Sequence, residues 1–303
     1  MSALDPVFTS TVRDVFDGFA DDTSVAAVWR QLDEIGLARL LAPETSGGSE
    51  ASWRELAFVL ETAARQAIST GIVGSDVLAG WLQRQAGAPD DGGLRGAVLV
   101  DVSGREVAGT RPDGAESVVT LAESADGWSV GDVVVGADVV ELFRLRGALA
   151  RAVQVAGALT EIGEITAEHV TTRIQFGRPL AKFQALQQML AESAAQTALT
   201  VTAVDAAVGT MDAFESGDVG LDRVRFDVAV ARSCAGHAAS TVVRNAHQAL
   251  GAIGTTVEHR LHKYTLPALR WCSEFGSTQY WDDVVADAAL EVGGDGLWEL
   301  IVG

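Results

Sequence analysis

Lysine and positive net charge are what this sequence most lacks. Only Lys182 and Lys263 are lysines among 22 basic residues, and 41 acidic residues bring the formal net charge to −19. Nucleic-acid binding depends on basic side chains that displace the counterions of phosphates, and this composition excludes it. The same charge argues against binding to an anionic membrane surface.

Cysteine and long apolar runs are scarce as well. Cys234 and Cys272 do not make a disulfide framework, and no CxxC motif or His/Cys cluster indicates a metal. No uncharged apolar run reaches the roughly 18 residues of a membrane-spanning helix. The N-terminal segment carries early acidic residues and no apolar core of a signal peptide, so we expect a cytoplasmic protein.

What the chain does have is enough apolar residues for a substantial core. Hydrophobic residues make up 48% of its 303 residues and charged residues 21%, which excludes a disordered chain. The periodicity predicts a mainly α fold with three domains. These are an N-terminal helical domain over 1–90, a short middle β segment over 91–140 and a C-terminal four-helix bundle over 141–303.

Local signals support each of them. Ser52 and Glu55 have the spacing of a capping box before a helix that continues to about Ala64. After a turn-rich linker at Gly87–Gly93, three short β-branched runs at 96–102, 117–121 and 128–135 predict three strands.

Apolar residues recur at helical spacing in two stripes of the C-terminal bundle. The stripes consist of Phe183, Leu186, Leu190, Ala194, Val201, Val204, Val208 and Met211, and of Val224, Val228, Ala231, Ala235, Ala238, Val242 and Ala249.

Two segments of the C-terminal bundle carry candidate chemistry. In RIQFGRPL, from Arg173 to Leu180, we expect one helix to end at the glycine and the next to begin near Pro179. Arginine and free amides at such a junction suit a phosphate, but an ordinary helical hairpin with a solvated arginine fits the same residues. In HQALGAIGTTVE, from His247 to Glu258, two glycines three residues apart leave the backbone open to a ligand or simply end a helix. Thr255 and Glu258 have the spacing of a capping box.

Together the segments RIQFGRPLAKFQALQQMLAE and HQALGAIGTTVEHRLHKY resemble the C-terminal bundle of the acyl-CoA dehydrogenase family. WRQLDEIGLARLLAPETSGG resembles that family's opening helices. The resemblance implies FAD as cofactor, an acyl-CoA as substrate and an electron-transfer acceptor. It implies that three groups of residues contact FAD. Arg173 and Gln175 match the family's pyrophosphate positions, and Phe183 and Gln184 match its adenosine positions. The family's loop along the dinucleotide is matched by Gln248, Gly251, Ala252 and Gly254. In the family these residues reach FAD bound mainly by the neighbouring subunit, so a dimer is implied.

The sequence also departs from the family pattern. The usual catalytic base is a glutamate just before a glycine-threonine turn, and here Phe275 stands in that place with Glu274 one position early. On a helix this displacement would turn the Glu274 carboxylate roughly 100° away. The family's alternative base position falls near Gly147. His247, His259 and His262 are interpreted as polar surface or interface residues. No segment of the short β region matches the portion of the family fold that lines the flavin ring.

Three functions remain open. The chain could be the smaller subunit of a heteromeric (α2β2) dehydrogenase for sterol-derived or other bulky acyl-CoAs, with the base and flavin cradle supplied by its partner. It could be a self-sufficient homodimeric dehydrogenase that uses Glu274, or a flavin-free helical interaction subunit. The retained Arg173 and the Gln248–Gly254 loop favour a flavin role, and the short β segment favours the heteromer.

Overall fold

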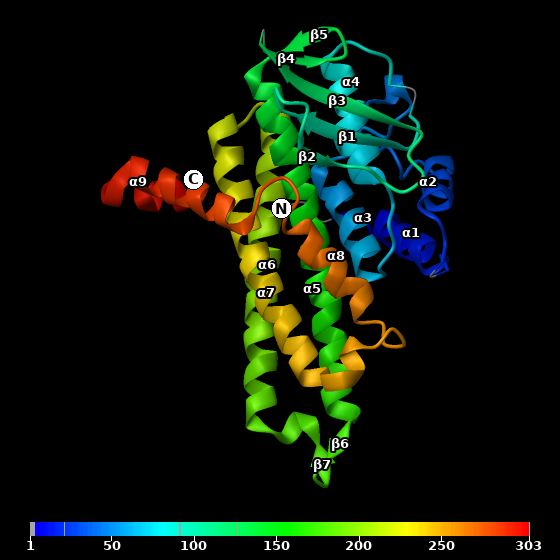
Figure 1. Ribbon diagram of the computed structural model, residues 1–303, viewed down its shortest axis with the longest axis vertical. Helices are drawn as coiled ribbons and strands as arrows, with labels where there is room; N and C mark the ends of the chain where they lie inside the picture. Colours follow the sequence, from blue (N-terminus) through cyan, green and yellow to red (C-terminus); the bar gives the residue numbers. More distant parts are fainter. Residues whose placement is uncertain (1–3, 21, 91, 126, 303) are drawn as a thin grey trace. The chain divides into compact units, whose positions relative to one another are not determined.

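A computed structural model describes residues 4–20, 22–90, 92–125 and 127–302 of the chain (Figure 1). It divides into two compact units, Met1–Ala158 and Leu159–Gly303. The division falls inside the long helix α5 (Ala137–Thr172). Among the described residues no helix is long and apolar enough to cross a membrane.

The first unit begins with helices α1 (Pro6–Asp17), α2 (Val25–Glu34) and α3 (Trp53–Arg65), with a 3-10 turn η1 (Glu44–Ser46) before α3. The predicted capping box is confirmed, because the Glu55 amide donates to the Ser52 hydroxyl at 3.2 Å and the Ser52 amide donates to the Glu55 carboxylate at 2.8 Å. A π-helical segment η2 (Val73–Gly80) leads directly into α4 (Trp81–Gln85). The linker predicted at Gly87–Gly93 includes Asp91, which lies outside the described residues.

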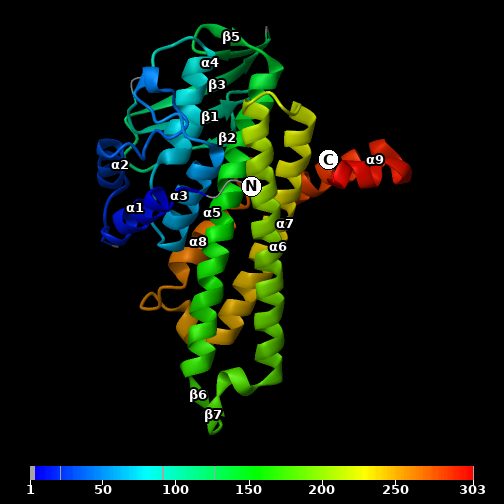
Figure 2. The ribbon, with the colours of Figure 1, turned by 180° about the vertical axis from the view of Figure 1, so that it is seen from behind.

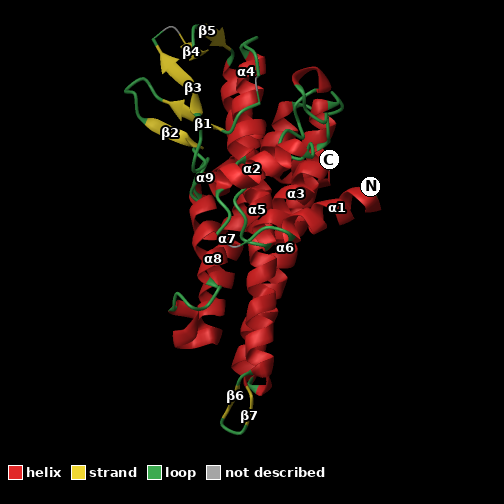
Figure 3. Ribbon diagram, turned by 90° about the vertical axis from the view of Figure 1, so that its right-hand side faces the viewer, coloured by secondary structure: helices red, strands yellow, loops and turns green. Residues whose placement is uncertain are grey.

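A five-stranded sheet completes this unit (Figure 3), where the sequence predicted three strands. Its order is β2 (Glu106–Thr110), β1 (Arg95–Val100), β3 (Ser117–Ser124), β4 (Gly127–Val130) and β5 (Val133–Val135). β1 and β3 are parallel and the other pairs are antiparallel.

Two local features explain the difference in strand number. The run 128–135 is a hairpin of two strands rather than one. The strand β2 contains Gly109, where an added Cβ would lie 2.5 Å from the Ala97 carbonyl oxygen. Its close approach to β1 therefore requires a glycine, which weakens the strand pattern in the sequence.

The second unit is helical. After α5, a small hairpin of β6 (Ile174–Gln175) and β7 (Arg178–Pro179) and a 3-10 turn η3 (Leu180–Lys182) lead into α6 (Gln184–Glu215). Helix α7 (Leu221–Leu250) returns antiparallel to α6 (Figure 2). The 3-10 turn η4 (Gly251–Thr255), α8 (His262–Trp271) and α9 (Thr278–Val302) follow, and α9 is interrupted at Gly293 (φ 66°, ψ 179°).

The apolar stripe predicted on α7 is confirmed, since all seven of its residues are buried. Its alanines let α6 and α7 approach closely. On α6 the predicted stripe is buried at Val204, Val208 and Met211, whereas Leu186 and Leu190 near its start remain half-exposed. The helical unit therefore keeps apolar side chains accessible at the end where α6 begins.

Candidate functional site

The candidate site lies at one end of the helical unit. Because α5, α6 and α7 run antiparallel in turn, the C-terminus of α5, the N-terminus of α6 and the C-terminus of α7 meet at that end (Figure 2). All eight residues that the sequence assigns to FAD lie at these three termini, on the hairpin between α5 and α6, or on the turn after α7. The topology thus gathers residues that are up to about eighty positions apart in the sequence.

Arg173 lies directly after α5, with an exposed side chain. Its amide donates to the His169 carbonyl and its own carbonyl accepts from the Leu180 amide, both at 2.9 Å. The predicted helix end at the glycine is wrong. α5 stops at Thr172, and Phe176 (φ 51°) and Gly177 (φ 77°) form a two-residue turn of left-handed conformation that starts a hairpin.

The hairpin presents Gln175 opposite Arg178 and an 89% exposed Phe176 at its tip. The Arg178 guanidinium lies 4.2 Å above the ring of Phe183, and Phe176 contacts the same ring edge-on at 6.1 Å between centroids. Phe183 is therefore held as a flat apolar surface between the Arg178 guanidinium and the Phe176 ring.

Helix α6 does not begin at Pro179, as predicted, but at Gln184. Phe183 is its N-cap residue and makes no side-chain cap hydrogen bond, and the first turn contains no acidic residue. The Leu186 and Gln187 amides donate to the Phe183 carbonyl, both at 3.1 Å. The amides of Gln184 and Ala185, the first two residues of this 32-residue helix, are therefore the ones that suit an acceptor, and the helix dipole adds positive potential there.

Buried polar contacts fix how α7 lies against α6. The Asn245 side-chain amide donates to the Met189 carbonyl at 3.3 Å and to the Ser193 hydroxyl at 3.2 Å. Further along, the Thr200 hydroxyl donates to the Cys234 carbonyl at 3.3 Å. Continuing this antiparallel register places Gln184 opposite Gly251, so the start of α6 and the turn after α7 border the same surface.

The turn after α7 has one open glycine and one packed glycine. Gly251 adopts φ 64° and ψ −142°, and an added Cβ there would meet nothing within 4 Å. Gln248 and Ala252 beside it are exposed. At Gly254 an added Cβ would lie 2.9 Å from Leu250, so this glycine has a packing role. The accessible backbone at Gly251 and the exposed Arg173 fit a planar, anionic dinucleotide.

The capping box predicted at Thr255 and Glu258 is wrong. The Thr255 hydroxyl donates to the Ala252 carbonyl at 2.8 Å and closes the 3-10 turn, and the next helix begins only at His262. The Thr255 hydroxyl therefore bonds to the carbonyl three residues before it and does not cap a following helix, as the local pattern had predicted. Glu258 therefore lies in a turn and caps no helix.

Arg232 holds the turn that contains Phe275, the residue at the family's usual base position. It is 2% exposed and comes from α7. Its guanidinium donates to four carbonyls of the turn between α8 and α9, at 3.1, 3.0, 2.9 and 3.2 Å, those of Trp271, Cys272, Glu274 and Gly276. One buried cation thus holds almost the whole turn, and nothing in the local sequence indicated this.

The base position itself is closed. Phe275 is 1% exposed with φ 60°. Glu274 does not lie on a helix, as the sequence argument assumed, because α8 ends at Trp271 and α9 begins at Thr278. Its side chain is 20% exposed, and its carboxylate lies 3.6 Å from the Arg270 guanidinium. The alternative position, Gly147, is a buried glycine of α5.

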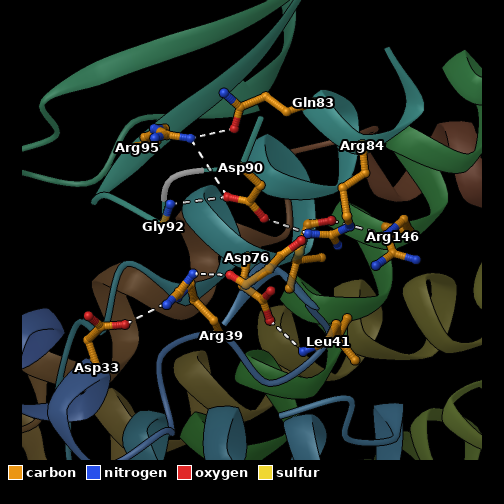
Figure 4. A network of polar contacts seen from close by, with 12 residues as sticks. Asp33, Arg39, Leu41, Asp76, Gln83, Arg84, Asp90, Gly92, Arg95 and Arg146 are labelled. Atoms are coloured by element: carbon orange, nitrogen blue, oxygen red, sulfur yellow. Dashed lines mark hydrogen bonds and ion pairs between the residues drawn. The ribbon is translucent and has the colours of Figure 1, made fainter. Parts of the chain in front are cut away.

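The first unit holds a buried polar network that the sequence analysis did not detect (Figure 4). Asp76, on the π-helical segment, is 2% exposed and accepts the Leu41 amide at 2.8 Å through Oδ2, while its Oδ1 has no partner among the described residues. Burial raises the pKa of Asp76 to about 6, against the lowering effect of the Leu41 amide and of Arg84 and Arg146. Asp90, which pairs with Arg84 at 2.7 Å, raises it further.

Arg146 is the second unusual member of this region. It is 4% exposed, donates to the Val77 carbonyl at 3.1 Å, and lies 5.0 Å from the rings of both Trp53 and Trp81. Two indoles thus hold one guanidinium against the π-helical segment. Over the described residues, no group of three His, Cys, Asp or Glu side chains is placed to hold a metal.

Comparison with known proteins defines the class. The model of the acyl-CoA dehydrogenase C-terminal domain matches residues 136–290, just over half of the chain, from the start of α5 into α9. The chain belongs to the acyl-CoA dehydrogenase family, a family of oxidoreductases. The resemblance stated from its motifs is confirmed.

Similar curated proteins carry the same family name. Acyl-CoA dehydrogenase FadE34 of Mycobacterium tuberculosis is 28% identical, over 84% of this chain and 41% of FadE34. Acyl-CoA dehydrogenase IpdE2 of the same organism is 27% identical, over 78% of this chain and 79% of IpdE2. The chain thus spans less than half the length of one relative and about four fifths of the other.

Solved structures confirm the fold. The ChsE4-ChsE5 complex from Mycobacterium tuberculosis matches with a TM-score of 0.78 at 20% identity, over 95% of this chain and 97% of that one. Glutaryl-CoA dehydrogenase from Mycobacterium smegmatis matches with a TM-score of 0.80 at 15% identity, over 97% and 96%. The predicted acyl-CoA dehydrogenase-like fold is confirmed.

Proposed function

We propose that this chain is a subunit of a heteromeric, FAD-dependent acyl-CoA dehydrogenase and completes the adenine and pyrophosphate portion of its FAD site. One observation carries the proposal. Arg173, the uncapped start of α6 and the open backbone at Gly251 converge on one accessible end of the helical unit. The closed base position at Phe275 points to a partner chain as the source of the base.

Each group has a role that follows from its chemistry. The Arg173 guanidinium would bind phosphate oxygens in a planar, charge-assisted geometry, with the first amides of α6 beside it. Phe183 and Gln184 would contact the adenosine, with Gln175 on the hairpin strand. The backbone from Gln248 to Gly254 would lie along the dinucleotide, where a side chain at Gly251 would intrude.

When bound, FAD supplies the acceptor for the β-hydride of an acyl-CoA whose α-proton a carboxylate removes. Two-chain relatives support a partner. One matched structure is named as a complex of ChsE4 and ChsE5, and another as the Tcur3481-Tcur3483 steroid acyl-CoA dehydrogenase, with a TM-score of 0.75 at 18% identity. A sterol-derived or other bulky acyl group is accordingly the substrate class we propose. The half-exposed Leu186 and Leu190 provide apolar surface for such a partner.

The test compares bound flavin, measured by absorbance per chain, in two preparations. One is the chain purified alone, and the other is the chain co-expressed with the proteins that its neighbouring genes encode. We expect little flavin in the first and a stoichiometric amount in the second. Stoichiometric flavin in the chain alone would instead establish a self-sufficient homodimer, and none in either would favour a flavin-free interaction subunit.

Arg173→Ala in the assembled complex tests the phosphate contact directly. Loss of a charge-assisted hydrogen bond should weaken FAD binding by about 1.5–3 kcal/mol, or roughly 10- to 100-fold. Arg30→Ala, an exposed arginine of α2 in the other unit, is the matched control and should leave FAD affinity unchanged. Equal affinities for the two variants would remove Arg173 from the site.

A further inference from the structure

Helix α9 exposes apolar residues of the kind that a surface helix normally buries. Among its side chains that the structure describes, Trp281 near the start is buried and none of the later ones is. Leu290 is 79% exposed and Trp298 is 73% exposed. The other exposed large apolar residues beyond Trp281 are Val292, Leu297, Ile301 and Val302. A surface helix of a single folded chain turns such residues toward its own core, so α9 has the arrangement of a helix that another surface covers.

Polar contacts fix α9 to α7. The Ser233 hydroxyl of α7 donates to the Asp282 carboxylate at 2.6 Å, and His237 Nε2 lies 3.0 Å from the same carboxylate. Near the other end of α9, the Arg223 guanidinium at the start of α7 donates to the Leu300 carbonyl at 2.9 Å. Because α9 is attached near both ends, its apolar residues form a preformed surface rather than a frayed terminus.

The exposed apolar residues are enough for a large share of an interface. Four of them, Leu297, Trp298, Ile301 and Val302, follow Gly293 at a spacing that puts them on one face of the helix. With the two exposed residues before Gly293 they present on the order of 500 Å² of apolar area. One side of a standard protein interface buries about 800 Å². Monomeric proteins rarely leave apolar patches larger than a few hundred Å² open to water.

Acidic residues border this apolar surface. Glu291 directly follows Leu290, and Glu299 directly follows Trp298, so both carboxylates lie at its edge. Over its whole length α9 has six acidic residues and no lysine, arginine or histidine. The acidic residues are Asp282, Asp283, Asp287, Glu291, Asp295 and Glu299. A surface that complements α9 must therefore be apolar at its centre and carry lysine or arginine at its rim.

A second copy of this chain does not offer such a surface. Two α9 helices would repel each other through their acidic residues. On the neighbouring helix α8, the Arg270 guanidinium already lies 3.6 Å from the Glu274 carboxylate. The exposed cations Arg173, Arg178 and Lys182 lie together at the flavin end of the unit, where the proposed cofactor would use them. The charge of α9 therefore favours a different chain as its partner.

We propose that α9 binds the second subunit of the heteromer, and that this subunit covers α9 with an apolar surface rimmed by lysine and arginine. The inference rests on the proposed function for the existence of that subunit. The contacts of α9 with Arg223, Ser233 and His237 lie in the first half of α7, whereas the flavin residues lie at the other end of that helix (Figure 1). The α9 contact is thus separate from the flavin site.

The experiment uses the complex purified after co-expression with the proteins that the neighbouring genes encode. The test variant combines Trp298→Ser and Ile301→Ser, and the matched control combines Leu199→Ser on α6 and Leu266→Ser on α8, which are exposed to a similar degree. Mass photometry of diluted complex gives the Kd between the two subunits. We expect the Kd to rise at least about 30-fold in the α9 variant, because central apolar anchors dominate binding, and less than about threefold in the control. Equal Kd values for the two variants would overturn the proposal.

Charge variants test the chemistry of the partner surface. Glu291→Lys combined with Glu299→Lys should weaken the complex, since two cations would then face a basic rim. Glu291→Gln combined with Glu299→Gln should make the association rate less sensitive to salt. A complex that is unchanged or tighter in the lysine variant would overturn the proposal.

Sedimentation of the purified chain alone distinguishes a second copy from the partner subunit. A dimer of this chain that the Trp298 and Ile301 substitutions dissociate would show that α9 binds its own kind, and would overturn the proposal. A flavin-bearing complex that tolerates these substitutions refutes only the role of α9. A complex that depends on them and never binds FAD refutes only the proposed flavin function. A wild-type chain that recovers no stoichiometric partner refutes both.

Discussion

Removing the Arg232 guanidinium should destabilise the helical unit by far more than an ordinary surface change. In Arg232→Met the apolar stem keeps most of the buried volume, and the four carbonyls that the guanidinium serves lose their donor. A hydrogen bond from a charged donor contributes about 1.5–3 kcal/mol, and neighbouring bonds from one group are not additive. Water can reach some of the turn, so we expect a loss of about 3–5 kcal/mol.

The conformation of the turn makes this estimated loss of stability a lower bound. Phe275 with φ 60° is a non-glycine residue in a region that costs on the order of 1 kcal/mol or more, and Gly276 with φ 126° is in a glycine conformation. Without Arg232, the hydrogen bonds that hold these residues in this conformation are lost. The buried ring of Phe275 should then become mobile, and with it the position that corresponds to the family's base.

The assay is thermal unfolding followed by circular dichroism. A loss of 3–5 kcal/mol should lower the Tm by roughly 6–20 °C for a unit of this size. Arg244→Met, an exposed arginine on the same helix, is the matched control and should change the Tm by less than about 2 °C. Arg232→Lys should fall between them, because an ammonium can reach one or two of the carbonyls. Equal Tm values for Arg232→Met and Arg244→Met would refute the reasoning.

Four further changes test other features. Asp76 has a raised pKa of about 6, so its stabilising protonated form is complete below about pH 4 and is lost as the pH rises through 6. Asp76→Asn should therefore abolish a fall in unfolding free energy of roughly 2–2.5 kcal/mol between pH 4 and 7.5, and identical pH profiles for the two proteins would contradict this. Ser52→Ala should cost about 1 kcal/mol by removing the confirmed cap of α3, measured as urea midpoint, and an unchanged midpoint would show that the box contributes nothing. Glu274→Gln should leave turnover per bound flavin in the complex nearly intact, whereas a general base lost would cost about 10²–10⁴-fold; a thousandfold fall with flavin bound would make this chain the catalytic subunit. Since no helix begins at Thr255, Glu258→Ala should leave the Tm within about 1 °C, and a fall of several degrees would show that Glu258 has a structural role that the turn does not reveal.

Local sequence determined those features that depend on neighbouring residues. The capping box at Ser52 and Glu55 and the stripe of small residues on α7 follow from hydrogen bonds and periodicity within one helix. The order of the two C-terminal motifs was also sufficient to indicate the family. The capping box and the stripe could be predicted because the interactions that cause each of them join residues within a single helix.

Local sequence was misleading where two short-range arrangements compete for the same groups. The Phe176-Gly177 pair ends a helix in one interpretation and forms a two-residue hairpin turn in the structure. The Thr255 hydroxyl has the spacing of a cap but donates to a 3-10 carbonyl. In both places the alternatives differ by little locally, and packing of the adjoining helices decides between them.

Only the tertiary structure decided the remaining features. The acceptors of Arg232 lie about forty residues away along the chain, and the Asp76 carboxylate accepts an amide thirty-five residues away. Arg173, Gln184 and Gly251 lie at the same end of the helical unit because three helices run antiparallel in turn. Burial, the pKa of Asp76 and the convergence of a site all depend on such distant partners, because water is excluded only when separate segments pack together.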